Sequence, residues 1–364
     1  MKIAIIGTRG IPNNYGGFEQ FTEKVSVLLI SKGYDVTVYN SSLHPYTLSK
    51  WNGVNIVKKY DPENKIGTAG QFLYDLNCIL HARKQKYDII LQLGYTSSSI
   101  WNFLFKKRDI IITNMDGLEW KRTKYSSKTQ SFLKYAEKLA VKKSDFLIAD
   151  SKGIQTYLKA KYKVDSEYIA YGASLVSEPN TDILEVYNVA PNNYHLVIAR
   201  FEPENNIEEI IKGHLLFPDK KLLLVGNYKN EFGSYLKETY KQANIFFLGG
   251  IYDESILNSL RYYSAFYFHG HSVGGTNPSL LEAMACRCLI IAHENEFNKS
   301  VLGANAFYFN TGEDIHKLLE RHLEKTNYLN YIENNTHMIT YEFNWEHIAN
   351  QLDSLFKRAV LKHG

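Results

Sequence analysis

The sequence predicts an α/β protein with two doubly wound parallel sheets in tandem, and three observations carry this prediction. Short apolar runs rich in β-branched residues alternate with helical patterns along almost the whole chain. The alternation pauses once, between Ser174 and Asn193, where Pro179, Pro191 and several small polar residues give a linker-like composition. The length of 364 residues suits two domains. Apolar strands separated by helices favour parallel sheets that are covered on both faces.

We therefore place a first domain at residues 1–185 and a second at 186–343, with a closing helix over 344–364 that completes the first domain. The predicted strands of the first domain are Lys2–Ile6, Asp35–Tyr39, Val54–Val57, Asp88–Leu91, Ile110–Thr113 and Phe146–Ala149, and its first helix is Glu19–Ser31. In the second domain we expect strands at Tyr194–Arg200, Lys221–Val225, Asn244–Leu248, Ala265–His269 and Leu289–Ala292. Its predicted helices are Ile207–Phe217, Glu231–Gln242, Glu254–Tyr263 and Pro278–Cys286.

Composition narrows the class of protein. Cys78, Cys286 and Cys288 are too few for a disulfide framework, and we interpret them as reduced core thiols of a cytoplasmic protein. The first residues predict a strand and a turn at Gly7 instead of a signal peptide. No apolar run reaches the roughly 18 residues that span a bilayer, so any membrane contact is expected to be peripheral.

The charge is uneven along the chain. Residues 1–185 contain 26 Lys and Arg against 18 Asp and Glu, although the whole chain has a net charge of only +4. A basic half favours an anionic partner, and a solvated lysine surface explains it equally well. Within it, an amphipathic helical pattern between Lys121 and Lys143 predicts either contact with anionic lipid at the inner face of the membrane or an ordinary solvated helix face. Its basic residues are Lys121, Arg122, Lys124, Lys128, Lys134, Lys138, Lys142 and Lys143. No recognisable nucleic-acid-binding motif is present, so we expect no nucleic-acid partner.

The loop after the first strand, Gly7 to Glu19, lacks the dinucleotide fingerprint G-x-G-x-x-G because Arg9 stands at the second glycine position. This disfavours a nicotinamide-dependent enzyme. Gly16 and Gly17 instead precede the helix, where unobstructed backbone amides make a site for anions, and Arg9 adds charge. A plain flexible turn is the alternative interpretation.

The loop after the strand Ile110–Thr113 concentrates polar groups. Asp116 and Glu119 are candidates for a general base or for binding sugar hydroxyls. The alternative for Asp116 is that it caps the turn.

Two loops of the second domain follow strands in the same way. Arg200 stands at the end of the first strand, and its charge and forked donors suit a diphosphate. Gly274, Gly275 and Thr276 lead into a helix and form a second candidate anion cradle. Glu282, early in that helix, is a candidate acceptor for ribose hydroxyls.

Together these loops resemble the motifs of retaining family-4 glycosyltransferases of the GT-B fold. The segments that carry the resemblance are the donor-site stretches Arg200–Asn206 and Gly274–Ala285, the glycine pair Gly16-Gly17, and the closing-helix start Asn344-Trp345-Glu346. More narrowly, four segments resemble the bacterial β-1,4-rhamnosyltransferase subgroup: GTRGIPNNYGGFE, DGLEWKR, EPENN and GHSVGGTNPSLLEAMA. That resemblance implies two Rossmann-like domains facing a central cleft, and transfer of L-rhamnose from dTDP-L-rhamnose, with retention, to a lipid-linked sugar during polysaccharide synthesis.

Three positions depart from the family pattern. Asn205 replaces a lysine of the donor site, Gly274 replaces the first of two glutamates, and Met115 replaces a histidine that contacts the sixth hydroxyl of the donor sugar. L-rhamnose has a methyl group at that carbon, and an apolar, adaptable Met packs against a methyl better than a histidine would. The third departure thus fits a 6-deoxy donor, although a Met after a strand is more often part of a core.

From the residues and the resemblance together, we expect catalysis by Asp116, Arg200 and Glu119. We expect the donor and its diphosphate to be bound by Gly16, Gly17, Arg9, Asn205, Gly274, Gly275, Thr276, Asn277 and Glu282. Met115 and His271 are assigned to the donor sugar, and Gly249 and Ile251 to the base. Because no D-x-D motif is present, no metal and no cofactor other than the nucleotide-sugar co-substrate are expected. A transferase for a UDP-hexose, a sugar-nucleotide epimerase and a non-catalytic anion-binding protein remain open as alternatives.

Overall fold

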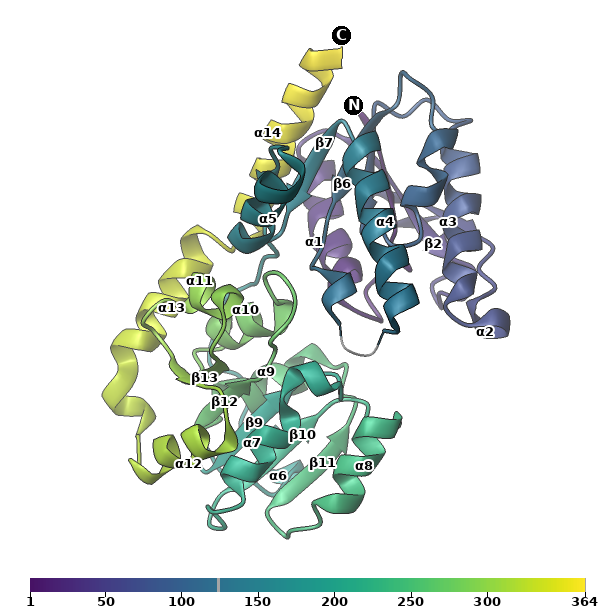
Figure 1. Ribbon diagram of the computed structural model, residues 1–364. Coiled ribbons are helices and arrows are strands. Elements are labelled where there is room, and N and C mark those ends of the chain that lie inside the picture. Colours follow the sequence, from purple (N-terminus) through teal and green to yellow (C-terminus); the bar gives the residue numbers. More distant parts are fainter. Residues whose placement is uncertain (123–124, 364) are drawn as a thin grey trace. The chain divides into compact units, whose positions relative to one another are not determined.

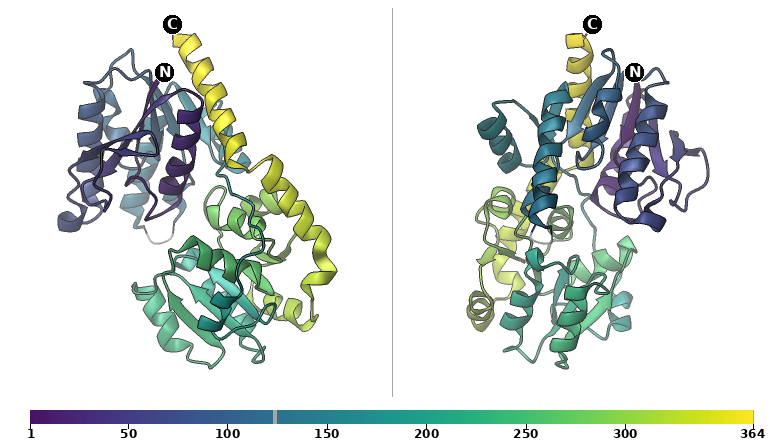
Figure 2. Two further views of the ribbon diagram at one scale, coloured as in Figure 1. Left: turned by 180° about the vertical axis from the view of Figure 1, so that it is seen from behind. Right: turned by 45° about the vertical axis from the view of Figure 1, so that its right-hand side comes forward.

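The computed structural model describes residues 1–122 and 125–363, which divide into two compact units (Figure 1 and Figure 2). The first unit contains Met1–Tyr171 and the chain from Trp345 onwards, and the second contains Gly172–Asn344. Each unit is built on its own parallel sheet with helices in the connections. The predicted class, two doubly wound parallel-sheet domains, is confirmed.

The sheet of the first unit has the strand order β3-β4-β2-β1-β5-β6-β7-β8 among the described residues. All neighbouring strands are parallel except β3 and β4. The strands are β1 Lys2–Ile6, β2 Asp35–Ser41, β3 Lys50–Trp51, β4 Val54–Lys59, β5 Ile89–Leu93, β6 Ile110–Asn114, β7 Phe146–Ala149 and β8 Glu167–Tyr168. The helices are α1 Gly17–Ser31, α2 Glu63–Ile66, α3 Ala69–Ala82, α4 Ser127–Lys143, α5 Lys152–Tyr162 and α14 Trp345–His363, with 3-10 turns η1 Ser99–Leu104 and η2 Glu119–Lys121.

The core of the first unit follows the strand and helix periodicities. Side chains of α3, including Tyr74, Cys78 and Ile79, pack on Ala4 and Ile6 of β1. The final helix α14 packs on α1, since the rings of Phe21 and Trp345 lie 6.3 Å apart and the Tyr34 hydroxyl donates to Asp353 at 2.5 Å. These contacts explain why a segment at the end of the chain belongs to the first unit.

The sheet of the second unit has the order β11-β10-β9-β12-β13-β14, and every neighbouring pair is parallel. Its strands are β9 Tyr194–Ile198, β10 Lys221–Val225, β11 Ile245–Gly249, β12 Phe266–His269, β13 Ile290–His293 and β14 Phe307–Phe309. Its helices are α6 Asp182–Val186, α7 Ile207–His214, α8 Glu231–Thr239, α9 Glu254–Tyr262, α10 Pro278–Ala285, α11 Glu296–Leu302, α12 Gly312–Glu320 and α13 Leu329–Tyr341, with 3-10 turns η3 Pro203–Asn205 and η4 Lys325–Tyr328.

Six strands of the first sheet, in the order β4-β2-β1-β5-β6-β7, and all six of the second can each be numbered from one along the chain. Numbered in this way, both sets have the 3-2-1-4-5-6 order of the doubly wound dinucleotide-binding fold. The direction of winding reverses between β1 and β5 in the first unit and between β9 and β12 in the second. In such sheets ligands bind beyond the carboxyl ends of the strands at this reversal. The loops after β1, β9 and β12, all singled out from the sequence, lie at these points, and the loop after β6 follows the strand next to β5.

The boundary between the units lies earlier in the chain than residue 185. Residues 172–185 belong to the second unit because their backbone is bonded there: the Ala173 amide donates to Phe343 O at 2.7 Å and the Val176 amide to Ala285 O at 3.2 Å. The Tyr263 hydroxyl also donates to Pro179 O at 2.6 Å. A linker-like composition therefore marks a segment that packs on the second unit.

Candidate functional site

In the second unit, the loops after β9 and β12 are bonded to each other at the reversal of the sheet. The amide and the hydroxyl of Ser272 both donate to Glu204 O, at 3.0 and 2.8 Å, and Asn206 Nδ2 donates to Gly270 O at 2.8 Å. A Cβ atom at Gly270 would lie 2.0 Å from Asn205 O, so only glycine permits this approach. The structure thus brings the predicted donor-site segments 200–206 and 270–277 to one end of one sheet.

Within the first of these loops, Arg200 and Asn205 have different roles. Arg200 is exposed, whereas Asn205 is buried and donates from Nδ2 to Arg200 O at 2.7 Å. The amide that stands in place of the family's lysine therefore holds the backbone of Arg200. Of the two side chains, the Arg200 guanidinium is the one presented to solvent, where its charge can meet a diphosphate.

The start of α10 uses its own donors internally. Pro278 has no N–H, the Ser279 amide donates to Asn277 Oδ1 at 2.9 Å, and the Leu280 amide donates to Asn277 O at 3.0 Å. The donors of an anion cradle at this point would therefore have to come from the preceding loop, Gly274 to Thr276, in which Gly274 has a φ of +136° and Thr276 is buried.

Glu282, predicted to accept from ribose hydroxyls, forms an ion pair with Arg261 of α9. The Arg261 side chain is 3 % exposed and that of Glu282 26 %. Burial lowers the pKa of Arg261, but Glu282 and other neighbours outweigh it and the net shift of this pKa is upward. Since a carboxylate has about four lone-pair sites, the pair orients Glu282 without using all of its acceptor capacity.

His271, assigned to the donor sugar, stacks on the buried His269 with ring centroids 4.4 Å apart. Its backbone oxygen accepts from Asn295 Nδ2 and Asn298 Nδ2, both at 3.0 Å, which anchors the loop on the start of α11. Burial, and then the neighbouring His271 and His293, lower the pKa of His269 well below its usual value, so His269 is neutral at pH 7. Among the described residues, no cluster of His, Cys, Asp and Glu has the arrangement of a metal site.

The predicted base-binding turn lies at the end of β11. Gly249 has a φ of +81° and its oxygen accepts from the Gly226 amide at 2.9 Å, while Ile251 is half-buried. A Cβ at Gly249 would lie 4.0 Å from the ring of Tyr228, so this aromatic ring borders the turn. A surface hollow beside Tyr228 runs along α8 and contains none of the predicted site residues; it is lined by Tyr228, Lys229, Ser234, Lys237, Glu238 and Lys241.

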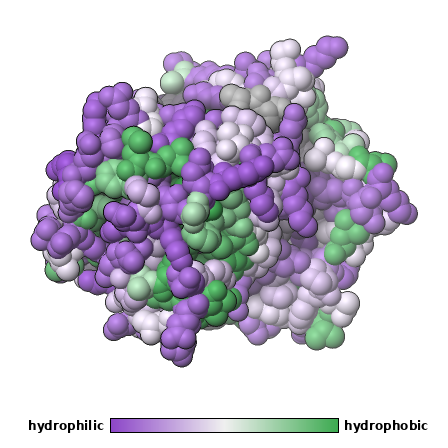
Figure 3. All heavy atoms as spheres, turned by 90° about the horizontal axis from the view of Figure 1, so that it is seen from below, coloured by the Kyte–Doolittle hydropathy of each residue, from purple (hydrophilic) through white to green (hydrophobic). Residues whose placement is uncertain are grey.

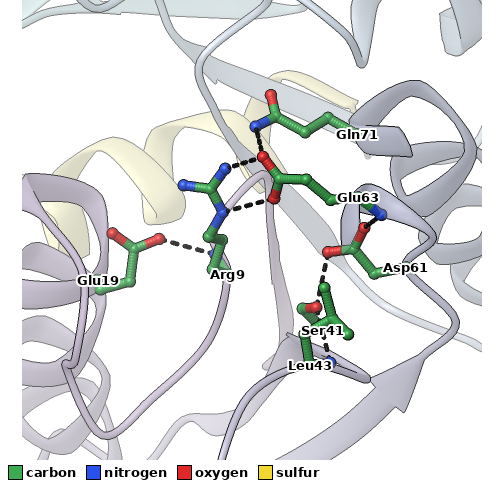
Figure 4. A network of polar contacts seen from close by, with 7 residues as sticks. All are labelled: Arg9, Glu19, Ser41, Leu43, Asp61, Glu63 and Gln71. Atoms are coloured by element: carbon green, nitrogen blue, oxygen red, sulfur yellow. Dashed lines mark hydrogen bonds and ion pairs between the residues drawn. The ribbon is translucent and has the colours of Figure 1, made fainter. Parts of the chain in front are cut away.

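In the first unit, Arg9 is held by a carboxylate. Its Nε and Nη2 donate to the two oxygens of Glu63 at 3.1 and 2.5 Å, and Gln71 Nε2 donates to Glu63 Oε1 at 3.0 Å (Figure 4). The guanidinium carbon lies 3.8 Å from the centroid of the Tyr15 ring. Burial lowers the pKa of Arg9, and Glu63 and Tyr15 outweigh this, so the pKa is raised. The charge that we assigned to a diphosphate is thus paired within the protein.

The segment that carries Glu63 is itself fixed to the end of β2. Asp61 Oδ2 accepts from the Ser41 hydroxyl at 2.6 Å, and Asp61 Oδ1 accepts from the Glu63 amide at 2.9 Å (Figure 4). Ser41 Oγ accepts in turn from the Leu43 amide at 3.0 Å. The carboxyl ends of β1, β2 and β4 are therefore joined by one polar network.

A carboxylate also lies beside the glycine pair Gly16-Gly17 at the start of α1. Glu19 is buried and accepts from the Arg9 amide at 2.7 Å and from the Thr8 hydroxyl at 3.1 Å. A Cβ at Gly16 would lie 3.4 Å from Glu19 Oε2. An anion at this helix start would meet a negative charge, so the local contacts favour a role for Glu19 in fixing the loop after β1.

The loop after β6 holds three of the predicted site residues. Met115 is 2 % exposed, and its amide donates to Ile148 O at 2.9 Å. Asp116 has a φ of +51°, and its amide donates to Asn114 Oδ1 at 3.0 Å, which closes a tight turn. Glu119 is paired with Arg122, whose Nη2 lies 2.6 Å from Glu119 Oε1.

Tyr171 is buried, and carboxylates that follow β1, β6 and β7 affect the pKa of its hydroxyl. Burial raises the pKa of Tyr171 well above its usual value, and the carboxylates of Asp116, Asp150, Glu19 and Glu119 raise it further, in that order. Asp150 follows β7 and Tyr171 ends the first unit. The carboxyl end of this sheet is thus acidic, although the first half of the chain is basic in composition.

Several of these residues were not singled out from the sequence. Glu63, Arg261 and Tyr171 lie outside the glycine-rich and strand-end motifs, and their partners are distant in the chain. Asn206 is the exception, because it stands within the predicted loop, and its φ of +50° is one that asparagine adopts more readily than most other residues.

The two halves of the chain match two family models. Residues 1–174 match one described as a domain of unknown function (DUF1972), and residues 183–357 match one described as glycosyl transferases group 1. The second half of this chain is a group 1 glycosyltransferase domain. An uncharacterized glycosyltransferase of Methanocaldococcus jannaschii is 23 % identical over 300 residues, which cover 76 % of each protein.

Solved structures resemble the whole chain in fold. Sucrose-phosphate synthase of Thermosynechococcus elongatus has a TM-score of 0.82 at 18 % identity, covering 99 % of both chains. HepE of Anabaena in complex with UDP-glucose has a TM-score of 0.75 at 17 % identity, covering 98 % of this chain and 99 % of HepE. The group 1 glycosyltransferase domain therefore occurs here within a GT-B fold. Across residues 1–122 and 125–363, no helix combines the length and hydropathy of a membrane span.

Proposed function

We propose that this protein transfers L-rhamnose from dTDP-L-rhamnose to a lipid-linked saccharide at the inner face of the bacterial membrane, with retention of anomeric configuration and without a metal. The observation that carries the proposal is the bonded pair of loops after β9 and β12 in the group 1 glycosyltransferase domain. These loops present the exposed Arg200, the Gly274–Thr276 stretch and the oriented Glu282 around one sheet end. That combination suits a nucleoside diphosphate, with a cation for the phosphates and a carboxylate for ribose hydroxyls.

The acidic end of the first sheet supports an acceptor role for the first unit. Carboxylates accept hydrogen bonds from sugar hydroxyls, whereas they repel phosphate groups. Asp116 has the position of a candidate base and Glu119 is oriented by Arg122. Because Arg9 is already paired with Glu63, we now assign the diphosphate to the second unit alone.

The metal-independent reaction rests on the sequence, which has no D-x-D motif. Charge that develops on the leaving diphosphate would be stabilised by the Arg200 guanidinium and by amides of the loop Gly274–Thr276. Activity after treatment with EDTA is the expected result. An absolute requirement for added Mg²⁺ would contradict this part of the proposal.

The rhamnose donor rests on the resemblance and on Met115. A UDP-hexose is the second candidate, and the likeness of the fold to HepE, which was solved with UDP-glucose, favours it. The decisive experiment offers the purified protein dTDP-L-rhamnose, UDP-glucose and UDP-galactose in turn and measures release of the nucleoside diphosphate. Saccharide acceptors are then screened with the best donor. Conversion of a nucleotide sugar into its isomer without any acceptor would identify an epimerase and overturn transfer.

The proposed membrane contact uses the lysines of α4. Lys128, Lys134 and Lys138 are exposed, whereas the apolar side of the helix, with Leu133 and Ala136, is buried in the unit. Lys124 lies outside the described residues. Exposed apolar side chains are also found on neighbouring elements, Phe103 of η1 and Leu73 of α3. Exposed lysines can bind anionic lipid headgroups, while the exposed apolar side chains beside them insert shallowly into the membrane.

The face seen in Figure 3 shows apolar groups interspersed with hydrophilic side chains, and the exposed apolar residues of the second unit include Leu216 and Tyr252. We expect vesicles that contain anionic phosphatidylglycerol to sediment the protein at low salt, and neutral phosphatidylcholine vesicles not to. Equal sedimentation with both, or with neither, would remove the contact from the proposal.

A further inference from the structure

A single buried carboxylate in the first unit accepts hydrogen bonds from five side chains. It belongs to Glu137 of α4, whose exposed fraction is 1 %. Oε1 accepts from the Tyr157 hydroxyl at 2.7 Å, Lys161 Nζ at 2.9 Å and the Tyr162 hydroxyl at 2.6 Å. Oε2 accepts from Trp120 Nε1 at 3.1 Å and from the Tyr95 hydroxyl at 3.5 Å.

The five donors come from three parts of the fold. Those on Oε1 all belong to α5, so this half of the carboxylate joins α4 to α5. Those on Oε2 belong to the loops that follow β5 and β6, because Tyr95 stands just after β5 and Trp120 lies in η2. Glu137 thus joins the helix layer to the loops at the carboxyl end of the sheet.

Trp120 is the link to the predicted chemistry. It follows Glu119 directly and shares the loop of residues 115–122 with Asp116. Its ring is enclosed by cations, with Lys134 Nζ 4.6 Å and Lys161 Nζ 5.5 Å from the centroid, and it lies 6.2 Å from the Tyr157 ring. An indole has one N–H donor, and here that donor is bonded to Glu137, which ties the edge of the ring to α4.

A buried carboxylate is costly unless its lone pairs are satisfied, and charge-assisted bonds to it are stronger than neutral ones. The three contacts on Oε1 join α4 to α5. The two contacts on Oε2 reach only the loops at the end of the sheet.

We propose that Glu137 is a positioning residue for the loop of residues 115–122, and that it acts through Trp120 to place Asp116 and Glu119. This inference rests on the proposed function of those two carboxylates.

The first test separates the two halves of the Glu137 carboxylate. In Glu137→Gln, the amide oxygen can still accept hydrogen bonds from α5. The amide nitrogen then lies opposite the Trp120 N–H, and because both groups are donors, the hydrogen bond to Trp120 is lost. Trp120→Phe removes the same link from the other side. We expect each variant to lose about 10- to 100-fold in kcat with KM for the donor changed less than twofold, since small misplacements of reacting groups have effects of this size.

The double variant Trp120→Phe with Glu137→Gln should lose no more than the worse single variant, because both changes break one link. Losses that multiply would show that Glu137 does not act through Trp120. Asp353→Asn is the matched control, since it removes a carboxylate that accepts from the Tyr34 hydroxyl in the same unit, on α14. It should lower thermal stability and leave kcat unchanged; a kcat loss equal to that of Glu137→Gln would reduce Glu137 to a general stabilising role.

A second test does not depend on activity, so it separates failure of this inference from failure of the proposed function. Hydrogen–deuterium exchange of the amides of residues 115–122 should be faster in Glu137→Gln and in Trp120→Phe than in the wild type and in Asp353→Asn. If the wild type transfers no sugar, this result still supports positioning of the loop. Unchanged exchange in both variants overturns it.

Discussion

The two units share one strand order and differ in what they place at the end of the sheet. In the second unit, the loops after β9 and β12 are bonded to each other and present the exposed Arg200. In the first unit, the cation Arg9 is paired with Glu63, and four carboxylates raise the pKa of the buried Tyr171. Under the proposed function, the same backbone scaffold supplies one end for phosphates and another for hydroxyls, and the side chains of the loops make the difference.

The difference extends to the buried titratable groups. The first unit buries an aspartate, Asp75, whereas the second buries His195 and His214 with ring centroids 5.0 Å apart. Their ring nitrogens have no hydrogen-bond partner. Through these groups, acid should act on the stability of the two units in opposite directions. All four tryptophans, Trp51, Trp101, Trp120 and Trp345, belong to the first unit, so their fluorescence reports its unfolding alone.

The largest expected effect concerns Asp75. Burial raises its pKa to about 7, while the Ser97 hydroxyl, which donates to Oδ2 at 2.6 Å, opposes the shift. Between pH 7 and pH 4 the native state then binds a proton that the unfolded state does not, so the first unit gains stability as the pH falls. This shift of the Asp75 pKa corresponds to about 4 kcal/mol in the free energy of unfolding. Urea unfolding followed by tryptophan fluorescence should show this trend, and Asp75→Asn should flatten it. An unaltered pH dependence in the variant would contradict the assignment.

The second effect has the opposite sign. Burial, and then the charge of Lys220, lower the pKa of His214 to about 4. Between pH 6.5 and pH 4 the unfolded state binds a proton that the native state does not, so the second unit loses about 3 kcal/mol as the pH falls. Circular dichroism should therefore show unfolding at lower urea than tryptophan fluorescence does at pH 4.5.

His214→Leu should bring the two unfolding curves closer together at pH 4.5. His337→Leu, at an exposed position of α13, is the control and should leave them apart. Coincident curves in the wild type at pH 4.5 would show that the units do not differ in this way.

The third effect tests the phosphate end. Arg200→Ala should lower kcat/KM by about 100-fold, because a lost electrostatic contact to a developing charge has an effect of this size. Arg321→Ala changes an exposed arginine on the same unit and should have little effect. Isothermal titration with dTDP and UDP would locate the loss in nucleotide binding. If Arg9→Ala lowers nucleotide affinity as much as Arg200→Ala does, the assignment of the diphosphate to the second unit alone is wrong.

The fold was predictable because the two sequence features that indicate it, apolar strand runs and glycines before helices, are local. Apolar strand runs such as Lys221–Val225 and the glycine before a helix are visible within a few residues, and β1 and β10 begin and end where they were expected. The pairings Arg9 with Glu63 and Arg261 with Glu282 join residues 54 and 21 positions apart, and no local pattern marks them. Sequence motifs thus identified which loops lie at the end of each sheet, but not which of their charges are already neutralised by a partner.

The smallest expected effect asks whether the first unit also selects the donor. Met115 is 2 % exposed, so a histidine there would be largely buried and would need a polar partner. If the methyl group of a 6-deoxy sugar contacts Met115, Met115→His should reduce the preference for dTDP-L-rhamnose over UDP-glucose by about tenfold, the equivalent of one unmatched polar group. Met115→Leu keeps the site apolar and should retain the preference. A preference that is unchanged in Met115→His, with the protein folded, would assign Met115 to the core and leave donor selection to the second unit.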